Sequence, residues 1–119
     1  MCIRDSKQTV QRYMERFAQL DHAGVLDCLT DDVEWLVPGA FQVRGKAAFD
    51  REIENEHFIG APAIIVDRLT EEGDVVVAEG RVRAEKRAGG ALVLLFCDVF
   101  EMRDSRISRL ISYLMEVPE

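Results

Sequence analysis

The sequence predicts an α+β domain, in which three N-terminal helices pack on a curved antiparallel sheet that encloses an apolar pocket. Two patterns predict this fold: apolar residues recur at helical spacing in the first part of the chain, and their period changes to two from residue 61 onward. With 119 residues, 48% of them hydrophobic and 3 of them proline, the chain can bury a core without disulfides or metal. We therefore expect one domain over residues 1–119.

Three helices are expected, over about residues 6–20, 23–29 and 46–55. In the first, Val10, Tyr13 and Phe17 fall on one face, and polar residues fall opposite. A short strand at 33–37 lies between the second and third helices, and Pro38-Gly39 predicts the turn that follows it.

Four long strands are expected over about residues 63–70, 74–86, 91–103 and 106–117, joined by short turns as an antiparallel meander. The third of these strands is apolar on both faces, whereas an antiparallel sheet with one solvated face alternates cleanly. Both faces therefore need cover, and we expect a homodimer packed sheet against sheet. The alternative is that the ends of the chain close the second face.

Charge and cysteine content limit the partners and the compartment. The formal net charge of −7 disfavours binding to nucleic acid or to anionic lipid. The longest apolar run, residues 91–97, is too short to span a bilayer, and no secretory signal is recognisable. Cys2, Cys28 and Cys97 form no C-x-x-C pair and are interpreted as free thiols, so we expect a cytoplasmic protein.

Asp98 stands out because it is a carboxylate inside the apolar run LLFCDVF. On a strand it shares a face with Phe96 and Phe100. Burying a carboxylate without a partner is costly, so the group either finds a strong donor or stays protonated. Both outcomes suit a binding site, which makes Asp98 the first candidate. The alternative is a structural aspartate bonded to a neighbouring strand or helix end.

Aromatic and histidine side chains supply further candidates, each with a structural alternative. Tyr13 lies in the apolar stripe of the first helix, where its hydroxyl needs a hydrogen-bond partner. Trp35 is either core or the wall of a small-molecule cavity. His57 follows the third helix and could cap its C-terminus as a cation, whereas His22 is interpreted as a surface residue.

Several kinds of site lack their motifs. The sequence has no glycine-rich phosphate loop and no G-x-S-x-G turn, and its 2 histidines lack the spacing of a zinc site. We therefore expect neither a metal nor a cofactor.

The element order and the run LTDDVEWLVPGAFQVRGKAAF resemble the SnoaL-like branch of the nuclear-transport-factor-two-like superfamily, which includes ketosteroid isomerases and polyketide cyclases. Asp31-Asp32-Val33, Gly45 and the closing SYLMEV carry this resemblance, which covers almost the whole chain. It implies the cone-shaped cystatin-like fold. It specifies function less well, because one fold hosts many activities.

The resemblance to ketosteroid isomerases implies roles for individual residues. Tyr13 matches their oxyanion-hole tyrosine, and Asp98 matches their protonated oxyanion aspartic acid. Val37, however, matches the general base, and valine cannot accept a proton. Leu29 and Ile53 match two tyrosines of the polar network. Steroid isomerisation by that mechanism is therefore disfavoured.

Two other relatives in fold imply different chemistry. In limonene epoxide hydrolase an Asp-Arg-Asp arrangement activates water; here Arg81 matches the arginine, but Arg83 and Ser112 occupy the aspartate positions. Polyketide cyclases of the SnoaL type use one acid in the pocket as general acid and base, and Asp98 is the candidate for that role.

The leading hypothesis is a dimer that binds a small, mostly apolar, carbonyl-bearing molecule, with cofactor-independent acid/base chemistry if it is an enzyme. Its catalytic candidates are Asp98 and Tyr13. The candidate ligand-binding residues are Phe17, Trp35, Val37, Phe49, Ile53, His57, Phe96, Phe100, Ser112 and Leu114. The competing hypothesis is a non-catalytic dimerisation or binding module with a filled core. An open cavity of a few hundred Å³ would favour the first.

Overall fold

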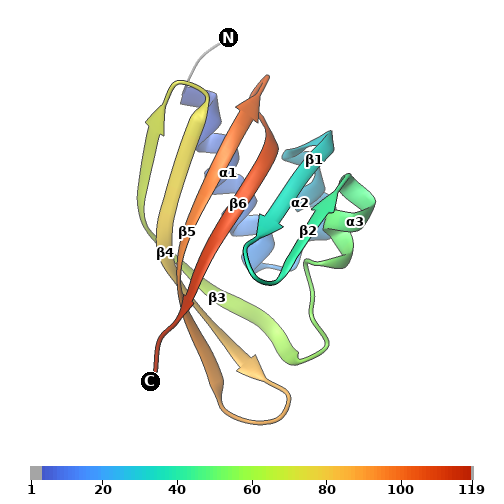
Figure 1. Ribbon diagram of the computed structural model, residues 1–119, viewed down its shortest axis with the longest axis vertical. Helices are drawn as coiled ribbons and strands as arrows, with labels where there is room; N and C mark the ends of the chain where they lie inside the picture. The colour runs from blue at the N-terminus through green and yellow to red at the C-terminus, as the bar shows by residue number, and fades with distance from the viewer. Residues whose placement is uncertain (1–3, 119) are drawn as a thin grey trace.

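A computed structural model describes residues 4–118 and shows helices packed on a strongly curved sheet (Figure 1). The elements in chain order are α1 (Arg4–Ala18), α2 (His22–Asp27), β1 (Leu29–Val37), β2 (Phe41–Arg44), α3 (Lys46–Arg51), β3 (Phe58–Glu72), β4 (Val75–Lys86), β5 (Ala91–Arg103) and β6 (Arg106–Glu116). The strands form one six-stranded sheet in the order β2-β1-β6-β5-β4-β3. Cys2 lies outside the described residues.

The apolar stripe of α1 faces the sheet as its spacing predicts. Val10, Tyr13 and Met14 are at most 6% exposed, while Gln11 and Arg12 are exposed. The helix ends at Ala18, two residues before the predicted end. Asp21 then caps α2, because its Oδ1 accepts a hydrogen bond from the Gly24 N–H at 3.0 Å.

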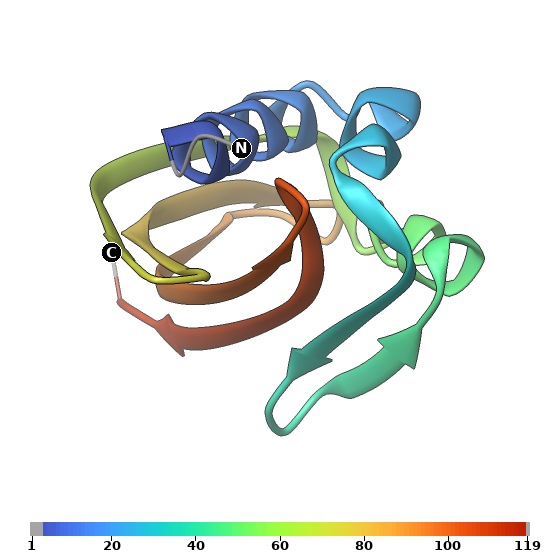
Figure 2. The same cartoon turned by 90° about the horizontal axis from the view of Figure 1, so that it is seen from above.

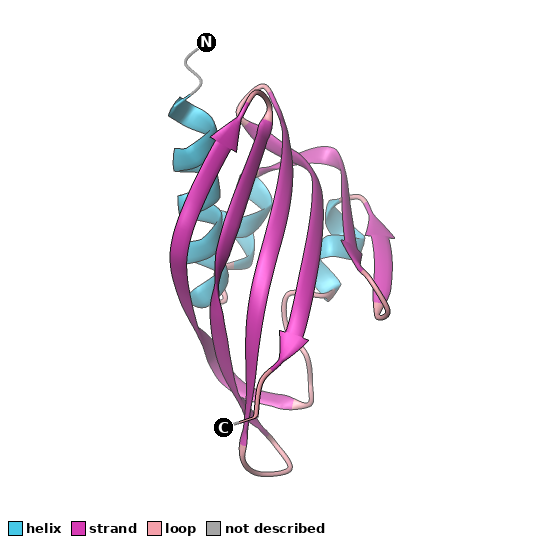
Figure 3. Cartoon of the chain, turned by 60° about the vertical axis from the view of Figure 1, so that its left-hand side comes forward, coloured by secondary structure: helices cyan, strands magenta, loops and turns pink. Residues whose placement is uncertain are grey.

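The predicted antiparallel meander is confirmed for β3 to β6. These strands form a curved sheet, and α1 lies against one side of it (Figures 2 and 3). Gly80 on β4 allows this close packing. A Cβ there would lie 2.0 Å from the Ile65 carbonyl oxygen and 2.7 Å from the ring of Phe96. Only glycine therefore lets β3 and the Phe96 ring approach the same point.

Two features of the predicted architecture are corrected. The sheet is mixed rather than antiparallel, because β1 pairs with β6 in parallel. The third helix follows the sheet's first two strands, so only α1 and α2 are N-terminal to the sheet. The strand β2 was not predicted: Pro38 and Gly39 turn the chain as expected, but the chain then pairs back onto β1 over Phe41–Arg44. Gly45 (φ 89°) turns it again into α3.

The two faces of the sheet differ in cover. The face toward the helices carries the core, in which Phe49, Phe100 and Leu110 are fully buried. The opposite face exposes large apolar side chains, including Leu95 (46% exposed) and Met115 (66% exposed). The homodimer expected from this face stays a prediction. Within residues 4–118, every helix falls short of the length and apolarity that a membrane span needs.

Candidate functional site

A cavity of about 150 Å³ lies between α1 and the inner face of the sheet. Its wall is mostly apolar. The exceptions are four side chains with polar atoms, one from each of α1, β1, β5 and β6: Tyr13, Trp35, Asp98 and Ser112. It is lined by Tyr13, Met14, Phe17, Trp35, Ile64, Val82, Leu94, Phe96, Asp98, Ser112 and Leu114. Leu114 is 46% exposed, so this part of the wall borders solvent.

Alternation along β5 and β6 explains how the site is assembled. Phe96 and Asp98 point to the inner face of β5, and Ser112 and Leu114 point to the same face of β6. The register places Asp98 directly opposite Ser112. The carboxyl group and the hydroxyl group are therefore neighbours across the two strands.

Asp98 is a buried acid with an unsatisfied oxygen. Asp98 is only 8% exposed, and its Oδ1 atom has no hydrogen-bond partner among residues 4–118. Burial raises the pKa of the carboxyl group from 3.8 to about 7, although a hydrogen bond from Ser112 opposes the rise. Near neutral pH, Asp98 therefore exists in both its acidic and its basic form.

Trp35 and Ser112 form a directional hydrogen-bond chain toward Asp98. The Trp35 Nε1–H donates to Ser112 Oγ at 3.0 Å, and both side chains are buried. An indole can only donate, so the Ser112 oxygen is the acceptor and its own proton is free to be donated. This proton stabilises the charged form of Asp98 and lowers the pKa of the carboxyl group.

Tyr13 brings a second polar group to the same cavity. The residue is 2% exposed, and its hydroxyl has no hydrogen-bond partner within the described part of the chain. Burial raises the pKa of the phenol well above 10, and the nearby Asp98 charge raises it further. The phenol therefore stays neutral and can donate a hydrogen bond into the cavity.

Aromatic rings hold the wall of the cavity in place. Phe49 stacks on Trp35 with ring centroids 4.4 Å apart, and Phe100 meets Tyr13 edge to face at 5.5 Å. Phe17 contacts both Tyr13 and Trp35 with tilted or perpendicular rings. Such contacts fix side-chain orientation as well as burying area.

The cavity brings together Tyr13, Phe17, Trp35, Phe96, Asp98, Ser112 and Leu114 from the predicted set. Phe49 and Phe100 lie one layer deeper, packed behind the wall in the core. Neither lines this cavity, and both rings contact that of Tyr13, which is part of the wall.

Val37, Ile53 and His57 also lie away from the cavity. Val37 is buried in the core at the end of β1. The helix α3 ends at Arg51 rather than at about residue 55, and Ile53, two residues beyond that end, lines a separate groove. His57 is exposed beyond the helix, and its backbone N–H donates a hydrogen bond to Asn55 Oδ1 at 2.8 Å.

Four residues of the wall were missed: Met14, Ile64, Val82 and Leu94. Each was visible as an apolar residue on the inner face of its element. The sequence pattern does not show where the sheet bends, and this bend turns these parts of β3 to β5 toward the cavity.

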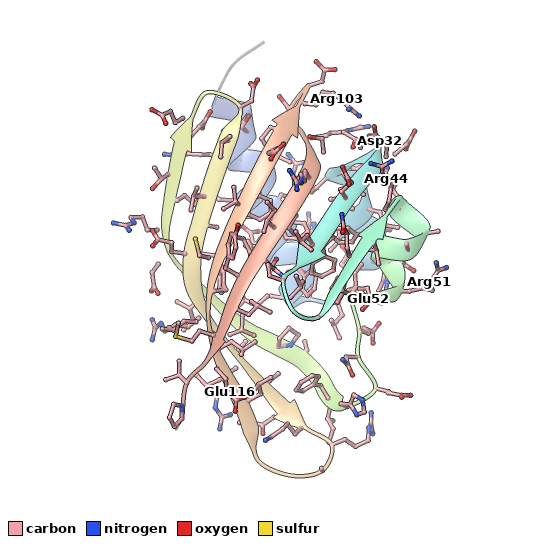
Figure 4. The ribbon with its side chains drawn as sticks, viewed as in Figure 1. Asp32, Arg44, Arg51, Glu52, Arg103 and Glu116 are labelled. Carbon is pink, nitrogen blue, oxygen red and sulfur yellow. The ribbon has the colours of Figure 1, made fainter. Side chains whose placement is uncertain are left out.

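Two groups of ionisable side chains with shifted pKa values lie outside the cavity. Asp32 on β1 and Arg103 at the end of β5 form an ion pair that lowers the pKa of the Asp32 carboxyl to about 2 (Figure 4). His22 lies between Asp50, at 2.6 Å, and Glu54, and hydrogen bonds to these carboxylates raise the pKa of its ring. Both clusters are on the surface and have the character of structural ion pairs.

A model of the SnoaL-like domain family matches residues 10–110. The chain belongs to the SnoaL-like domain family. No curated protein matches it. This SnoaL-like domain is similar in structure to a nuclear-transport-factor-two-like protein of unknown function from Burkholderia pseudomallei (25% identity, TM-score 0.83, 93% of this chain and 91% of that chain).

Two further solved structures share the fold of this SnoaL-like domain. One is an LEH-like epoxide hydrolase from M. tuberculosis (20% identity, TM-score 0.81, 93% of this chain and 83% of that one). The other is TerC, co-crystallised with polyporic acid (21% identity, TM-score 0.82, 91% of this chain and 89% of that one). At these identities, the two likenesses show that the fold is shared.

The hydrolase arrangement considered from the sequence is not assembled in the cavity of this SnoaL-like domain. Arg81 and Arg83 project from the outer face of β4, where Arg81 pairs with Asp67 at 3.2 Å. Only Ser112 of that trio lines the cavity. Among residues 4–118, no three His, Cys, Asp or Glu side chains are grouped as metal ligands.

Proposed function

We propose that this SnoaL-like domain binds a small, mostly apolar molecule, and that Asp98 and Tyr13 receive its carbonyl oxygen. The observation that carries the proposal is Asp98: a carboxyl group with an unpartnered oxygen, buried in the wall of an apolar cavity. In its neutral form it is a hydrogen-bond donor, as is the neutral Tyr13 phenol. Two donors in one apolar hollow favour a ligand with an acceptor oxygen.

The size of the cavity favours a ligand of about one ring. Clefts that hold drug-sized molecules are about 300–1,000 Å³, and an apolar void of about 150 Å³ can hold benzene. The Asp98 cavity has a volume of about 150 Å³, which is smaller than the few hundred Å³ that would favour a binding site over a filled core. A fused steroid skeleton does not fit into it.

The chemistry that this arrangement favours is proton transfer without a cofactor. With a pKa of about 7, the neutral Asp98 carboxyl can protonate the carbonyl oxygen, and the carboxylate it leaves can take a proton from the neighbouring carbon, which gives the enol; the reverse transfers return both protons. Val37 supplies no second base. Isomerisation, cyclisation or dehydration with one acid/base residue is the reaction class that follows, and Tyr13 stabilises the developing oxyanion.

A binding titration tests the proposal. Trp35 is the only tryptophan and lines the cavity, so its fluorescence reports occupancy. We expect cyclohexanone to bind and to change the emission, and methylenecyclohexane, in which a carbon replaces the carbonyl oxygen, to bind about tenfold more weakly. The factor corresponds to one hydrogen bond of about 1.5 kcal/mol.

Matched variants on β5 locate the binding. Leu94→Phe places a larger ring in the cavity wall and should abolish the response. Leu92→Phe, on the same face of the strand but not in that wall, should leave it intact. Equal binding by the two variants, or equal affinity for the two ligands, would refute the proposal.

We also propose that a second copy of the chain covers the outer face of the sheet. The exposed side chains Leu95, Tyr113 and Met115 form an apolar strip. Beside it, β3 and β4 carry both signs of charge, as in the Arg81–Asp67 pair. In a two-fold dimer the same patch of both copies meets. The apolar strip would then pack on its own copy, and the charges of both signs beside it could pair with those of the partner.

Sedimentation tests this dimer. Met115→Glu should shift the wild-type dimer to monomer, because a carboxylate would be buried opposite its own copy. Gln11→Glu, on the exposed side of α1, should leave the dimer unchanged. A wild-type protein that sediments as a monomer at all concentrations would exclude the second copy.

A further inference from the structure

A second, larger space lies beside the Asp98 cavity. A groove of about 540 Å³ runs between the end of α1, the segment after α3, and β3 and β4. Apolar side chains form much of its surface, including Leu20, Phe58 and Pro62. Carboxylates of residues 52, 54 and 56 lie along its rim.

Phe17 separates the two spaces. It is the one described residue that lines both the Asp98 cavity and the groove. Its ring lies against Tyr13 and Trp35, with centroids 5.7 and 6.0 Å away. Unlike Phe49 and Phe100, it is only partly buried, so the protein core does not enclose it.

We infer that Phe17 determines ligand length, because its ring closes the Asp98 cavity against the groove. The inference rests on the proposed function and names the class of ligand: a one-ring carbonyl compound whose far end meets Phe17. Without this ring the two spaces join, and a ligand with its oxygen at Asp98 can extend a tail into the groove.

The groove also restricts the tail that an opened site would accept. Its floor suits an uncharged apolar group, which gains free energy from burial. The Arg87 guanidinium is already engaged, donating to the Glu56 carbonyl at 2.9 Å and to the Phe58 carbonyl at 3.3 Å. The groove's lining residues include three carboxylates and this one guanidinium, so a tail ending in a carboxylate would meet a net negative charge.

A gain-of-binding experiment tests the role of Phe17. The ligands are cyclohexanone, the same ketone with a phenyl group opposite the carbonyl, and the same two-ring ketone with a carboxylate on its phenyl group. Wild-type protein should bind only the first. Phe17→Ala should bind the uncharged two-ring ketone at least about tenfold more tightly than wild type, because the second ring is then buried. The carboxylate-bearing ketone should stay weak.

Two further variants keep the test decisive. Phe17→Leu removes less of the wall and should give an intermediate gain, even if Phe17→Ala fails to fold. Leu20→Ala enlarges the groove but leaves the wall in place, so its ligand preference should match wild type. If folded Phe17 variants keep the wild-type length limit while cyclohexanone still binds, the inference about Phe17 fails and the proposed function stands. If wild type binds no ketone, the proposed function fails.

Discussion

Replacing Asp98 by leucine should lower the affinity for cyclohexanone several-fold, part of the way to that of its hydrocarbon analogue, because the Tyr13 donor remains. Leucine has a similar shape and keeps the wall closed, but it removes the carboxyl donor. The loss should be larger, about 100-fold, for nitrophenolate, whose oxygen carries the charge that develops in an enolate. Removing one oxyanion donor from an enzyme commonly costs a factor of that size or more. Trp35 fluorescence gives both affinities.

Two control variants define what the loss means. Asp98→Asn keeps the shape and an N–H donor, so it should retain most of the ketone affinity while losing any proton transfer. Glu101→Gln removes a partly exposed carboxylate of the same strand, paired with Arg109, and should change neither ligand's affinity. A folded Asp98→Leu protein with wild-type affinity for both ligands would rule out the proposed role of Asp98.

The stability of the folded protein should fall as pH rises from about 4 to about 7, and Asp98 should cause the fall. The pKa of an ordinary aspartate carboxyl is 3.8 and that of Asp98 in the fold is about 7, so the folded state holds the proton more tightly. Its contribution is therefore complete below pH 4 and is lost as pH rises through 7. At 1.36 kcal/mol per unit, the loss is roughly 4 kcal/mol as an upper bound.

Urea unfolding at several pH values measures this fall, and variants identify its source. Asp98→Leu should flatten the curve and make the protein more stable than wild type at pH 8, because no buried charge forms. Ser112→Ala should move the upper end of the fall above pH 7, since the Ser112 hydroxyl lowers the pKa of Asp98. A wild-type curve that is flat from pH 4 to 7 would contradict the buried acid.

Asp32 and His22 also make the stability depend on pH, but their effects can be separated from that of Asp98. The pKa of Asp32 is lowered to about 2, so its contribution is present above pH 4 and is lost only as pH falls toward 2. The pKa of His22 is raised above 6.5, so its contribution is present below that pH and is lost at higher pH. His22→Gln removes this effect and leaves the Asp98 curve to be compared alone.

The sequence predicted the elements whose pattern is local. The stripe on α1 and the alternation in β4, β5 and β6 were long enough to place these elements within about two residues. It missed β2 and the parallel pairing of β1 with β6, because Phe41–Arg44 is too short to show a period. The partner of β1 also lies at the far end of the chain. Such pairings depend on tertiary contacts that no local pattern encodes.

The same limit explains the site. Asp98 could be found because a carboxylate in an apolar strand is costly wherever it lies. Phe100 could not be separated from Phe96 by sequence, because both alternate inward on β5 and only the curvature of the sheet decides which ring meets the open space. Phe49 likewise faces inward from α3, and the sequence does not show how deep it lies. His57 was misplaced with the end of α3, a boundary that a helix pattern defines only loosely.

Titration of the Asp98 carboxyl carbon by NMR, assigned by its loss in Asp98→Asn, tests the central claim most directly. We expect a midpoint near pH 7, the value that burial in the cavity gives this group, and a higher midpoint when cyclohexanone occupies the cavity and accepts its proton in a hydrogen bond. A midpoint near pH 4, unchanged by the ketone, would show a solvated carboxylate and contradict the account.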